Sequence, residues 1–513
     1  MVNYFHVFFS YKFIPLLDSY ITPHSYNKVV QMEIPFKTLI NLNPDSSLPL
    51  YVQIANGISQ NIQAGILKTG TKLLGTRQMA ILLNVHRKTV VAAYDELYSE
   101  GWIEVFPKKG TFIAQHLPIV KPINFSSKHN HLESESPSLF IPENSFIEIP
   151  PVRTHRLSFN DGLPDVRLAP REELARLYAH YIRFGEPSVL QYTSPYGQIR
   201  FREVFSQFLN ETRGMNISPE NILTTRGSQM GFYLVGTAVF QKNDELIVGE
   251  LNYAAANMTF QSLGLNLNTI PIDDDGIVVD AIEAICEKKR IKAIYVTSHH
   301  YHPTTVTLKP ERRIKLLALA EKHGFYIIED DYDYDFHYAN RPVLPLASVD
   351  RHGLVIYLGS FTKRIAPTFR VGYIVAKPEI IQELAKHRRI MDRQGDTILE
   401  LVLADLLANG TLKRYTAKAL KTYRERRDFA CELLKTQLGD AIQFKIPDGG
   451  MAIWAKFDDK IPLVALSNKV AKKGLYLSNG SVYEGLNSCR MGFATMNLKE
   501  MEEAVGILRE CIF

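Results

Sequence analysis

The chain of 513 residues is too long for one ordinary hydrophobic core, so two or three domains are expected. A hydrophobic share of 46% and a charged share of 22% are typical of a soluble globular protein. The net charge of +5 is too small to indicate a partner, and no apolar run approaches membrane-spanning length, which argues against a membrane protein.

The four cysteines, Cys286, Cys431, Cys489 and Cys511, show no CxxC spacing. They predict reduced thiols in a cytoplasmic protein rather than a disulfide framework or a zinc site. Residues 1–34 form an N-terminal extension that lacks the basic start of a signal peptide. Our hypothesis is that translation begins at Met32.

Three helices are predicted after this extension, and a short turn separates the last two. Residues 49–64 carry apolar side chains at three- and four-residue spacing, which predicts an amphipathic helix. Thr76 is expected to be the N-cap of a helix through Leu83. After a turn at residues 84–85 a second helix begins at His86, and its core face carries Val90, Ala93 and Leu97. Helix, turn and helix is the geometry that places a second helix in the major groove of DNA.

The exposed start of that second helix is polar and cationic, with His86, Arg87, Lys88 and Thr89. These side chains suit phosphates and base edges. A hairpin is predicted over residues 102–113, and its turn carries Lys108 and Lys109, as a wing that touches backbone phosphate requires. Residues 35–116 hold eight Lys and Arg against five Asp and Glu, which allows a basic face. The alternative is a small structural domain with solvated lysines.

The same stretch resembles the winged helix-turn-helix of the GntR superfamily. The residues that carry the resemblance are Pro49-Leu-Tyr-Val-Gln, Gly65-Ile-Leu, Gly70, Thr76-Arg77, Thr89-Val-Val-Ala-Ala-Tyr, Leu97, Glu100-Gly101 and Gly110-Thr-Phe. One departure is that the family usually has Pro-Ser before the arginine, where this chain has Gly75-Thr76. The resemblance implies a double-stranded DNA partner, contacted by Thr76, Arg77, His86, Arg87, Lys88, Thr89, Lys108 and Lys109.

Residues 117–155 contain six prolines and many serines and asparagines, which predicts a linker. From residue 156 to 513 apolar strand candidates alternate with helices. The candidates are Ile222–Thr225, Glu245–Val248, Ala293–Thr297, Phe325–Ile328, Leu354–Leu358 and Val371–Val375. Such alternation predicts an α/β fold around a largely parallel sheet, with ligands beyond the carboxyl ends of the strands.

Lys363 follows the strand candidate that ends at Leu358. A lysine held at the end of a core strand is suited to form a Schiff base, because burial disfavours its ammonium form. The alternative is an ordinary surface lysine in a loop.

Several other polar groups follow strands in this part of the chain. Gly227, Ser228 and Gln229 open a helix whose free N–H groups favour a phosphate, and Arg370 could pair with the same phosphate. Asp330, at the end of a strand, could pair with a cationic ring nitrogen. The alternatives are helix or turn caps and structural ion pairs.

Three further side chains are candidates for ligand contacts. Tyr332 could hydrogen-bond a phenolic oxygen, and Tyr253 could stack on an aromatic ring. Arg490, on a strand candidate near the C-terminus, could hold a carboxylate.

The run of acids from Asp330 to Asp335 lacks the glycine and the closing glutamate of an EF-hand loop, so we discount calcium. His299, His300 and His302 could suggest a zinc site, but adjacent residues of a strand point to opposite faces, and no metal is predicted.

Together these motifs resemble a fold-type I, aspartate-aminotransferase-like domain over residues 156–513. The residues that carry the resemblance are Asp161-Gly-Leu-Pro-Asp, Tyr192 with Gly197, Gly227-Ser-Gln, Pro303-Thr, Asp330-Asp-Tyr, Ser360-Phe-Thr-Lys and Arg490-Met-Gly-Phe. The resemblance implies the cofactor pyridoxal 5'-phosphate (PLP), with Lys363 as its Schiff-base residue. Its other contacts would be Asp330, Tyr332, Gly227, Ser228, Gln229, Tyr253, His302, Ser360 and Arg370, and Arg490 would bind an amino acid carboxylate. His302 is a departure, because many aminotransferases place Asn there.

A winged helix joined by a linker to such a domain resembles the MocR subgroup of GntR-type regulators. The resemblance implies a PLP-dependent transcriptional regulator that senses an amine or amino acid and forms a homodimer with swapped DNA-binding domains. Two alternatives stay open. One is an active aminotransferase with an accessory DNA-binding domain, and the other is a sensor of PLP itself.

Overall fold

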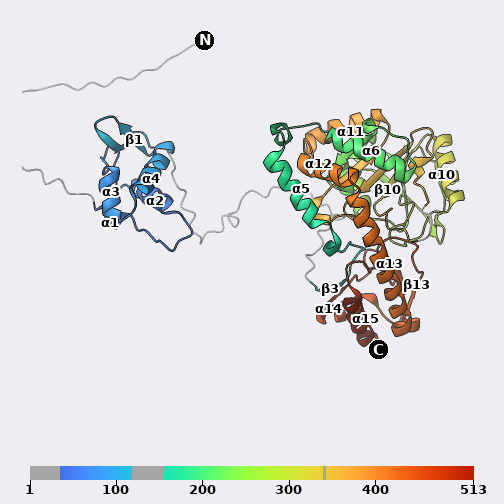
Figure 1. Cartoon of the computed structure of the whole chain (residues 1–513). Coiled ribbons are helices and arrows are strands. Elements are labelled where there is room, and N and C mark those ends of the chain that lie inside the picture. Colours follow the sequence, from blue (N-terminus) through green and yellow to red (C-terminus); the bar gives the residue numbers. More distant parts are fainter. Residues whose placement is uncertain (1–34, 118–154, 339–342, 484) are drawn as a thin grey trace, which may run out of the picture. The chain divides into compact units, whose positions relative to one another are not determined.

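The computed structural model describes residues 35–117, 155–338, 343–483 and 485–513 (Figure 1). Contacts between residues divide the chain into two compact units, one within residues 1–140 and one within residues 141–513. The N-terminal extension with Met32 and nearly all of the predicted linker lie outside the described residues. The domain boundaries at 35–116, 117–155 and 156–513 therefore stay predictions.

Over residues 35–117, the small unit consists of four helices followed by a hairpin. The helices are α1 (Phe36–Leu39), α2 (Leu50–Gln63), α3 (Thr76–Leu83) and α4 (Arg87–Ser99), and the strands are β1 (Ile103–Phe106) and β2 (Gly110–Ile113), which pair antiparallel. The predicted apolar faces are confirmed, because Ile54, Ile58 and Ile62 of α2 are buried in one core with Val90, Ala93 and Leu97 of α4. That packing fixes α3 and α4 as a helix-turn-helix with the hairpin beside it.

The predicted capping role of Thr76 is wrong. Gly75 is the N-cap of α3, and its carbonyl accepts from the N–H of Met79 at 2.9 Å. Thr76 is already helical, so its hydroxyl is free to accept from Nε of Arg87 at 3.4 Å. His86 is the N-cap of α4, and its Nδ1 accepts from the backbone N–H of Lys88 at 3.1 Å.

The large unit is built around a seven-stranded sheet with the order β4-β12-β11-β10-β9-β5-β6. Strand β12 is antiparallel to both of its neighbours, and the other pairs are parallel, which confirms the α/β fold with a mostly parallel sheet. The strands are β4 (Ile222–Thr225), β5 (Glu245–Gly249), β6 (Asn266–Ile270), β9 (Ile291–Val296), β10 (Tyr326–Asp331), β11 (Val355–Ser360) and β12 (Gly372–Val375).

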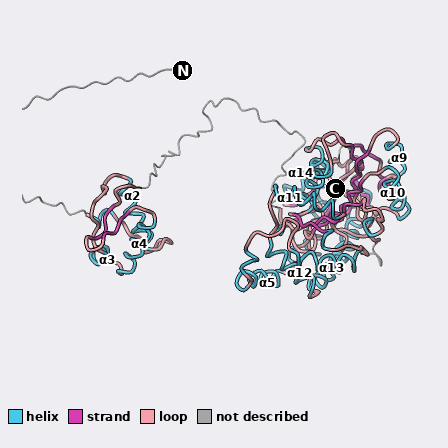
Figure 2. The backbone as a smooth tube through the Cα atoms, turned by 90° about the horizontal axis from the view of Figure 1, so that it is seen from above, coloured by secondary structure: helices cyan, strands magenta, loops and turns pink. Residues whose placement is uncertain are grey.

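Helices cover both faces of this sheet, so the strands (magenta in Figure 2) lie inside the unit. The helices of the large unit are α5 (Arg171–Phe184), α6 (Ile199–Arg213), α7 (Ser228–Val239), α8 (Ala254–Ser262), α9 (Asp280–Cys286), α10 (Pro310–His323), α11 (Pro378–Met391), α12 (Thr397–Ala408), α13 (Thr411–Leu438), α14 (Leu463–Lys472) and α15 (Leu498–Ile512). Ile327 and Val355 point to the core formed with α5, α6, α9, α10 and α12, whereas Ile328 and Ile356 point to the core formed with α7, α8 and α11. Burial on both faces explains why the inner strands contain apolar runs.

A third core lies in the C-terminal part of the chain. It joins an antiparallel sheet, β13 (Ile442–Phe444), β14 (Ala452–Phe457) and β16 (Ser488–Gly492), to α13, α14 and α15. Strand β3 (Leu157–Phe159) belongs to this core and pairs with β15 (Leu475–Leu477), and two short strands, β7 (Ile272–Asp273) and β8 (Gly276–Ile277), form a hairpin. The loop after β3 is thereby placed beside β16.

Within the described ranges of the chain, no helix combines the length and the apolar character that crossing a membrane requires.

Candidate functional site

A cavity of about 250 Å³ lies at the carboxyl ends of β10 and β11. It brings together nine of the predicted site residues, which are Ser228, Gln229, Tyr253, His302, Asp330, Tyr332, Ser360, Lys363 and Arg370. Four other lining residues have no role predicted from the sequence: Asp161, Leu163, Thr362 and Pro367. Groups that are far apart in the chain thus face one small space.

Lys363 lies three residues beyond the end of β11 and projects into this cavity. Its Nζ donates to the carbonyl oxygen of Gly162 at 2.6 Å. Burial lowers the pKa of Lys363, although the carboxylates of Asp161 and Asp333 act in the opposite direction. A larger share of the side chain is therefore the free, nucleophilic amine than in an exposed lysine.

Asp330, the next-to-last residue of β10, has one carboxylate oxygen engaged and one free. Its Oδ2 accepts from the hydroxyl of Tyr295 at 2.9 Å. Its Oδ1 is buried and has no hydrogen-bond partner among the described residues. Burial raises the pKa of Asp330 to about 7. A buried, unpartnered acceptor of this kind fits a ligand that brings a cationic N–H donor.

A site suited to an anion lies where α7 begins. Gly227 is its N-cap with φ of 80°, and Ser228 and Gln229 open the helix, whose first N–H groups have no partner within it. A Cβ at Gly227 would lie 2.6 Å from Nη2 of Arg370, so any other residue there would displace that guanidinium. Arg370 donates from Nη2 to the carbonyl of Arg226 at 3.1 Å. Free amide N–H groups and one guanidinium suit a phosphate.

Aromatic and hydroxyl groups line the space between these two ends. The ring of Tyr253 meets the ring of His302 edge-on, with centroids 5.2 Å apart. Burial raises the pKa of Tyr253 to about 12, so its phenol is neutral. The hydroxyl of Tyr332 donates to the carbonyl of His300 at 2.8 Å, and Ser360 donates to the hydroxyl of Thr362 at 2.7 Å.

The three histidines near β9 do not converge on one point. Each one faces a different carboxylate, His299 with Asp331 at 3.5 Å, His300 with Asp333 at 2.8 Å and His302 with Asp161 at 3.2 Å. Among the residues that the structure describes, no group of His, Cys, Asp or Glu has the arrangement of a metal site.

Arg490 reaches the site from β16, and its guanidinium is already surrounded. Its Nη1 donates to the carbonyl of Pro303 and its Nη2 donates to the hydroxyl of Tyr332, both at 3.2 Å. Its Nε lies 3.0 Å from Oδ1 of Asp161, an ion pair by distance that lacks the alignment of a hydrogen bond. The sequence motifs include Asp161 but do not predict this contact. The available signal was a carboxylate in the loop directly after a buried strand.

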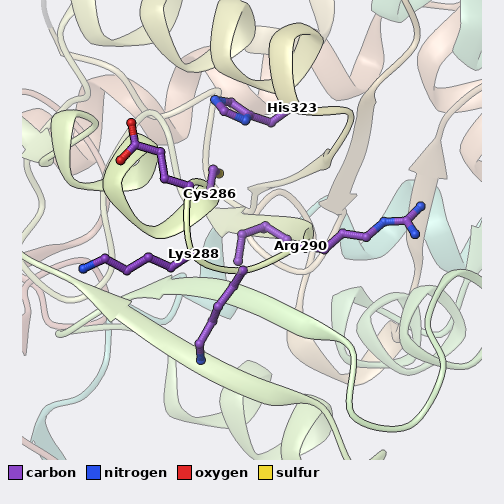
Figure 3. A pocket seen from close by; sticks show the side chains of 7 residues that line it. Cys286, Lys288, Arg290 and His323 are labelled. Atoms are coloured by element: carbon purple, nitrogen blue, oxygen red, sulfur yellow. The ribbon is translucent and has the colours of Figure 1, made fainter.

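A second hollow of about 350 Å³ lies elsewhere on the large unit, lined by Cys286, Lys288, Arg290 and His323 among others (Figure 3). Its charged side chains do not converge, because the amino group of Lys288 and the guanidinium of Arg290 point in different directions. We therefore assign it no chemistry.

The predicted DNA-contacting residues lie on the small unit at the start of α3, at the start of α4 and on the hairpin. The exposed members are Arg77, His86, Arg87, Lys88, Lys108 and Lys109, and the partly buried members are Thr76 and Thr89. Lys108 and Lys109 occupy the turn between β1 and β2. The geometry is compatible with the predicted contacts.

Comparison with known families assigns both units. Residues 163–508 match the model for aminotransferase class I and II, which is more than half of the chain. The chain belongs to the class I and II aminotransferase family. Residues 50–113 also match the gntR family of bacterial regulatory proteins. A DNA-binding winged helix therefore precedes the aminotransferase domain.

The relatives of this chain resemble either both of its units or only the larger one. The probable rhizopine catabolism regulatory protein MocR of Rhizobium meliloti is 27% identical over 92% of this chain and 95% of its own length. Kynurenine aminotransferase of Pyrococcus horikoshii, solved with PMP, is 27% identical with a TM-score of 0.65, over 70% of this chain and 91% of its own. LysN, the α-aminoadipate aminotransferase of Thermus thermophilus, was solved with N-(5'-phosphopyridoxyl)-L-leucine. It is 25% identical with a TM-score of 0.65, over 69% of this chain and 92% of its own. The predicted architecture is confirmed as a GntR-type regulator of the MocR kind, fused to an aminotransferase domain.

Proposed function

We propose that this protein is a cytoplasmic transcriptional regulator that binds PLP in the Lys363 cavity and changes its DNA binding when an amine or amino acid arrives. The observation that carries the proposal is one cavity that holds an amine nucleophile, a buried unpartnered carboxylate oxygen and an anion-binding helix start. That cavity belongs to a chain that also carries a winged helix.

The residues present fit the cofactor at each of its polar ends. Asp330 would hold the ring nitrogen through its free Oδ1, and Ser228, Gln229 and Arg370 would hold the phosphate at the start of α7. Tyr253 would lie against the ring, and Lys363 would bind the carbonyl carbon. When bound, the cofactor supplies an aldehyde that captures primary amines and a ring that withdraws electrons.

Lys363 gives the site a way to register a ligand. Its amine donates to the carbonyl of Gly162, in the loop that follows β3. A ligand that competes with Lys363 for the cofactor changes what this amine contacts, and therefore changes how the loop is held. A ligand that interacts differently with two states of a protein shifts the equilibrium between them.

We further propose a homodimer that exchanges its DNA-binding units between chains. Two copies of α4 could then contact paired half-sites, as dimeric helix-turn-helix proteins do. Sedimentation of the purified protein, alone and with operator DNA, measures whether it is a dimer.

A second candidate function is turnover as an aminotransferase, because Lys363, Asp330, Tyr332 and Arg490 all reach the same cavity region. The third candidate from the sequence, a sensor of PLP itself, needs the same pocket but no amine. One experiment separates the three. The loaded protein is mixed with amines and amino acids, and three signals are recorded: its visible spectrum, keto-acid release and retardation of DNA from upstream of its own gene.

A spectral change in proportion to the protein, with altered retardation and no sustained keto-acid release, is the expected result. Continuous keto-acid release would support an enzyme instead. Retardation that changes with PLP alone, and not with any amine, would support the PLP sensor. Failure to retard any upstream DNA would contradict the regulatory function altogether.

A further inference from the structure

The loop that carries Asp161 is fixed by its neighbour Asn160. The side chain of Asn160 accepts from the N–H of Leu163 at 2.7 Å and donates to the hydroxyl of Thr495 at 2.8 Å. Its carbonyl accepts from the N–H of Gly492, at the end of β16, at 2.6 Å. Asp161 is therefore held beside the strand that bears Arg490.

The carboxylate of Asp161 lies against two basic side chains. Oδ1 is 3.0 Å from Nε of Arg490, and Oδ2 accepts from Nε2 of His302 at 3.2 Å. Its partial burial opposes ionisation, but His302, Arg490 and Lys363 together outweigh it and lower the pKa of Asp161. Asp161 is accordingly an anion at neutral pH.

This pair neutralises the group that was predicted to bind an amino acid carboxylate. The side chain of Arg490 is 3% exposed, whereas that of Asp161 is 46% exposed, so Asp161 is the more accessible partner. A carboxylate arriving at Arg490 would have to displace Asp161 or lie next to it. Two like charges at such a distance repel, and a desolvated guanidinium that is already paired gains little from a second anion.

The other carboxylate that lines the cavity has a different task. Asp330 accepts from Tyr295, and its free oxygen is the atom that would hold the ring nitrogen of the cofactor. Asp161 is thus the lining carboxylate that has no role in the proposed cofactor contacts.

We propose that Asp161 makes this site select primary amines that carry no carboxylate, with amines that have a second cationic group favoured most. The proposal deepens the proposed function and rests on it. Arg490 then serves as the fixed counter-ion of Asp161, and the exposed side of the Asp161 carboxylate receives the far end of the ligand. An amine with no other charged group leaves the Asp161–Arg490 pair intact. A diamine adds an attraction between its second ammonium group and the carboxylate of Asp161.

The test uses two pairs of ligands that differ only in the α-carboxylate: cadaverine with L-lysine, and phenethylamine with L-phenylalanine. Each is titrated into the full-length, cofactor-loaded protein, with calorimetry and the visible spectrum as readouts. We expect each amine to bind at least about tenfold more tightly than its amino acid, a ratio that corresponds to one strong charge contact. Asp161→Asn should reduce that ratio by about tenfold or invert it. Asp459→Asn, the same change at an exposed aspartate, should leave it unchanged.

Two results would overturn the role of Asp161 while leaving amine sensing in place. One is tighter binding of the amino acids than of the amines by the wild-type protein, and the other is a ratio of affinities in Asp161→Asn equal to that of wild type. Heat and spectrum that respond to none of the four ligands would overturn the sensing function, and this inference with it. If Asp161→Asn fails to retain the cofactor, the wild-type ratio alone decides between selection for amines and selection for amino acids.

Discussion

The guanidinium of Arg370 lies against Gly227, so closely that a Cβ at residue 227 would stand 2.6 Å from Nη2 and 3.2 Å from Nη1. The backbone of Gly227 has φ of 80° and ψ of 171°, a combination essentially confined to glycine. The sharp turn from β4 into α7 and the approach of Arg370 thus both depend on the absence of one side chain.

Gly227→Ala should therefore damage the anion-binding end of the cavity. We expect PLP affinity to fall by at least about tenfold, because Arg370 must move and the turn is strained by about 1–3 kcal/mol. Spectral titration of the cofactor-free protein measures the loss. Gly474→Ala is the matched control, since Gly474 has φ of 81° and open space around its added Cβ. Equal losses in the two variants would mean that backbone strain alone is responsible.

Lys363→Ala should abolish covalent retention of the cofactor but not all of its binding. Asp330 and Arg370 remain, so we expect PLP to stay bound reversibly with affinity reduced by about 100-fold. Borohydride treatment followed by mass spectrometry should attach the cofactor to wild type and to Lys472→Ala, which changes an exposed lysine of α14, but not to Lys363→Ala. Attachment at another lysine would contradict the assignment.

The sequence predicted the large unit well where strands are buried on both faces. Ile222–Thr225 is found at those bounds, whereas β10 continues through Glu329, Asp330 and Asp331, which the apolar pattern could not include. Strand β6 was missed because Asn266 and Thr269 at the sheet edge are exposed, so its five residues show no apolar run. The prediction that Thr76 caps α3 was wrong because the carbonyl of Gly75 accepts the first helical hydrogen bond. Composition does not indicate which backbone carbonyl accepts that bond.

The candidate site was predictable for residues at strand ends and helix starts, since their chemistry is local. It was not predictable where a contact joins distant segments. Asp161 and Arg490 are 329 residues apart in the chain, and they meet only because β3 packs into the C-terminal core. Tyr295, which fixes the Asp330 carboxylate, had no signal beyond being one more apolar strand residue.

The protonation of Asp330 predicts a pH dependence for the cofactor-free protein. Burial raises its pKa from 3.8 to about 7, so the folded state binds more protons than the unfolded state between these values. Stability should therefore fall as pH rises from about 4 to 7. In Asp330→Asn this contribution disappears, and above pH 7 the cofactor-free variant should be more stable than wild type by roughly 1–3 kcal/mol.

The measurement is thermal unfolding across pH for wild type, Asp330→Asn and the exposed control Asp459→Asn. Loaded with PLP, Asp330→Asn should show the reverse order, because its neutral amide no longer holds a protonated ring nitrogen. A variant that binds PLP as tightly as wild type would place the ring nitrogen elsewhere.

On the small unit, Lys108 and Lys109 at the hairpin turn are exposed, as is Arg87 at the start of α4. Replacing both lysines by alanine should weaken binding to every DNA sequence alike. It should also reduce the slope of log K against log salt by about 2, because each lysine that no longer neutralises a phosphate lowers the slope by about one unit. Arg87→Ala should instead cost about 1–3 kcal/mol on the operator and little on random DNA, if its guanidinium contacts a base.

Anisotropy titrations of both variants on upstream and random duplexes, at several salt concentrations, separate these effects. Lys37→Ala on α1 changes an exposed lysine outside the predicted set of DNA contacts, and should alter neither affinity nor slope. An unchanged slope in the double lysine variant would remove the hairpin from the DNA interface. An unchanged operator affinity in Arg87→Ala would remove this arginine of α4 from the recognition surface.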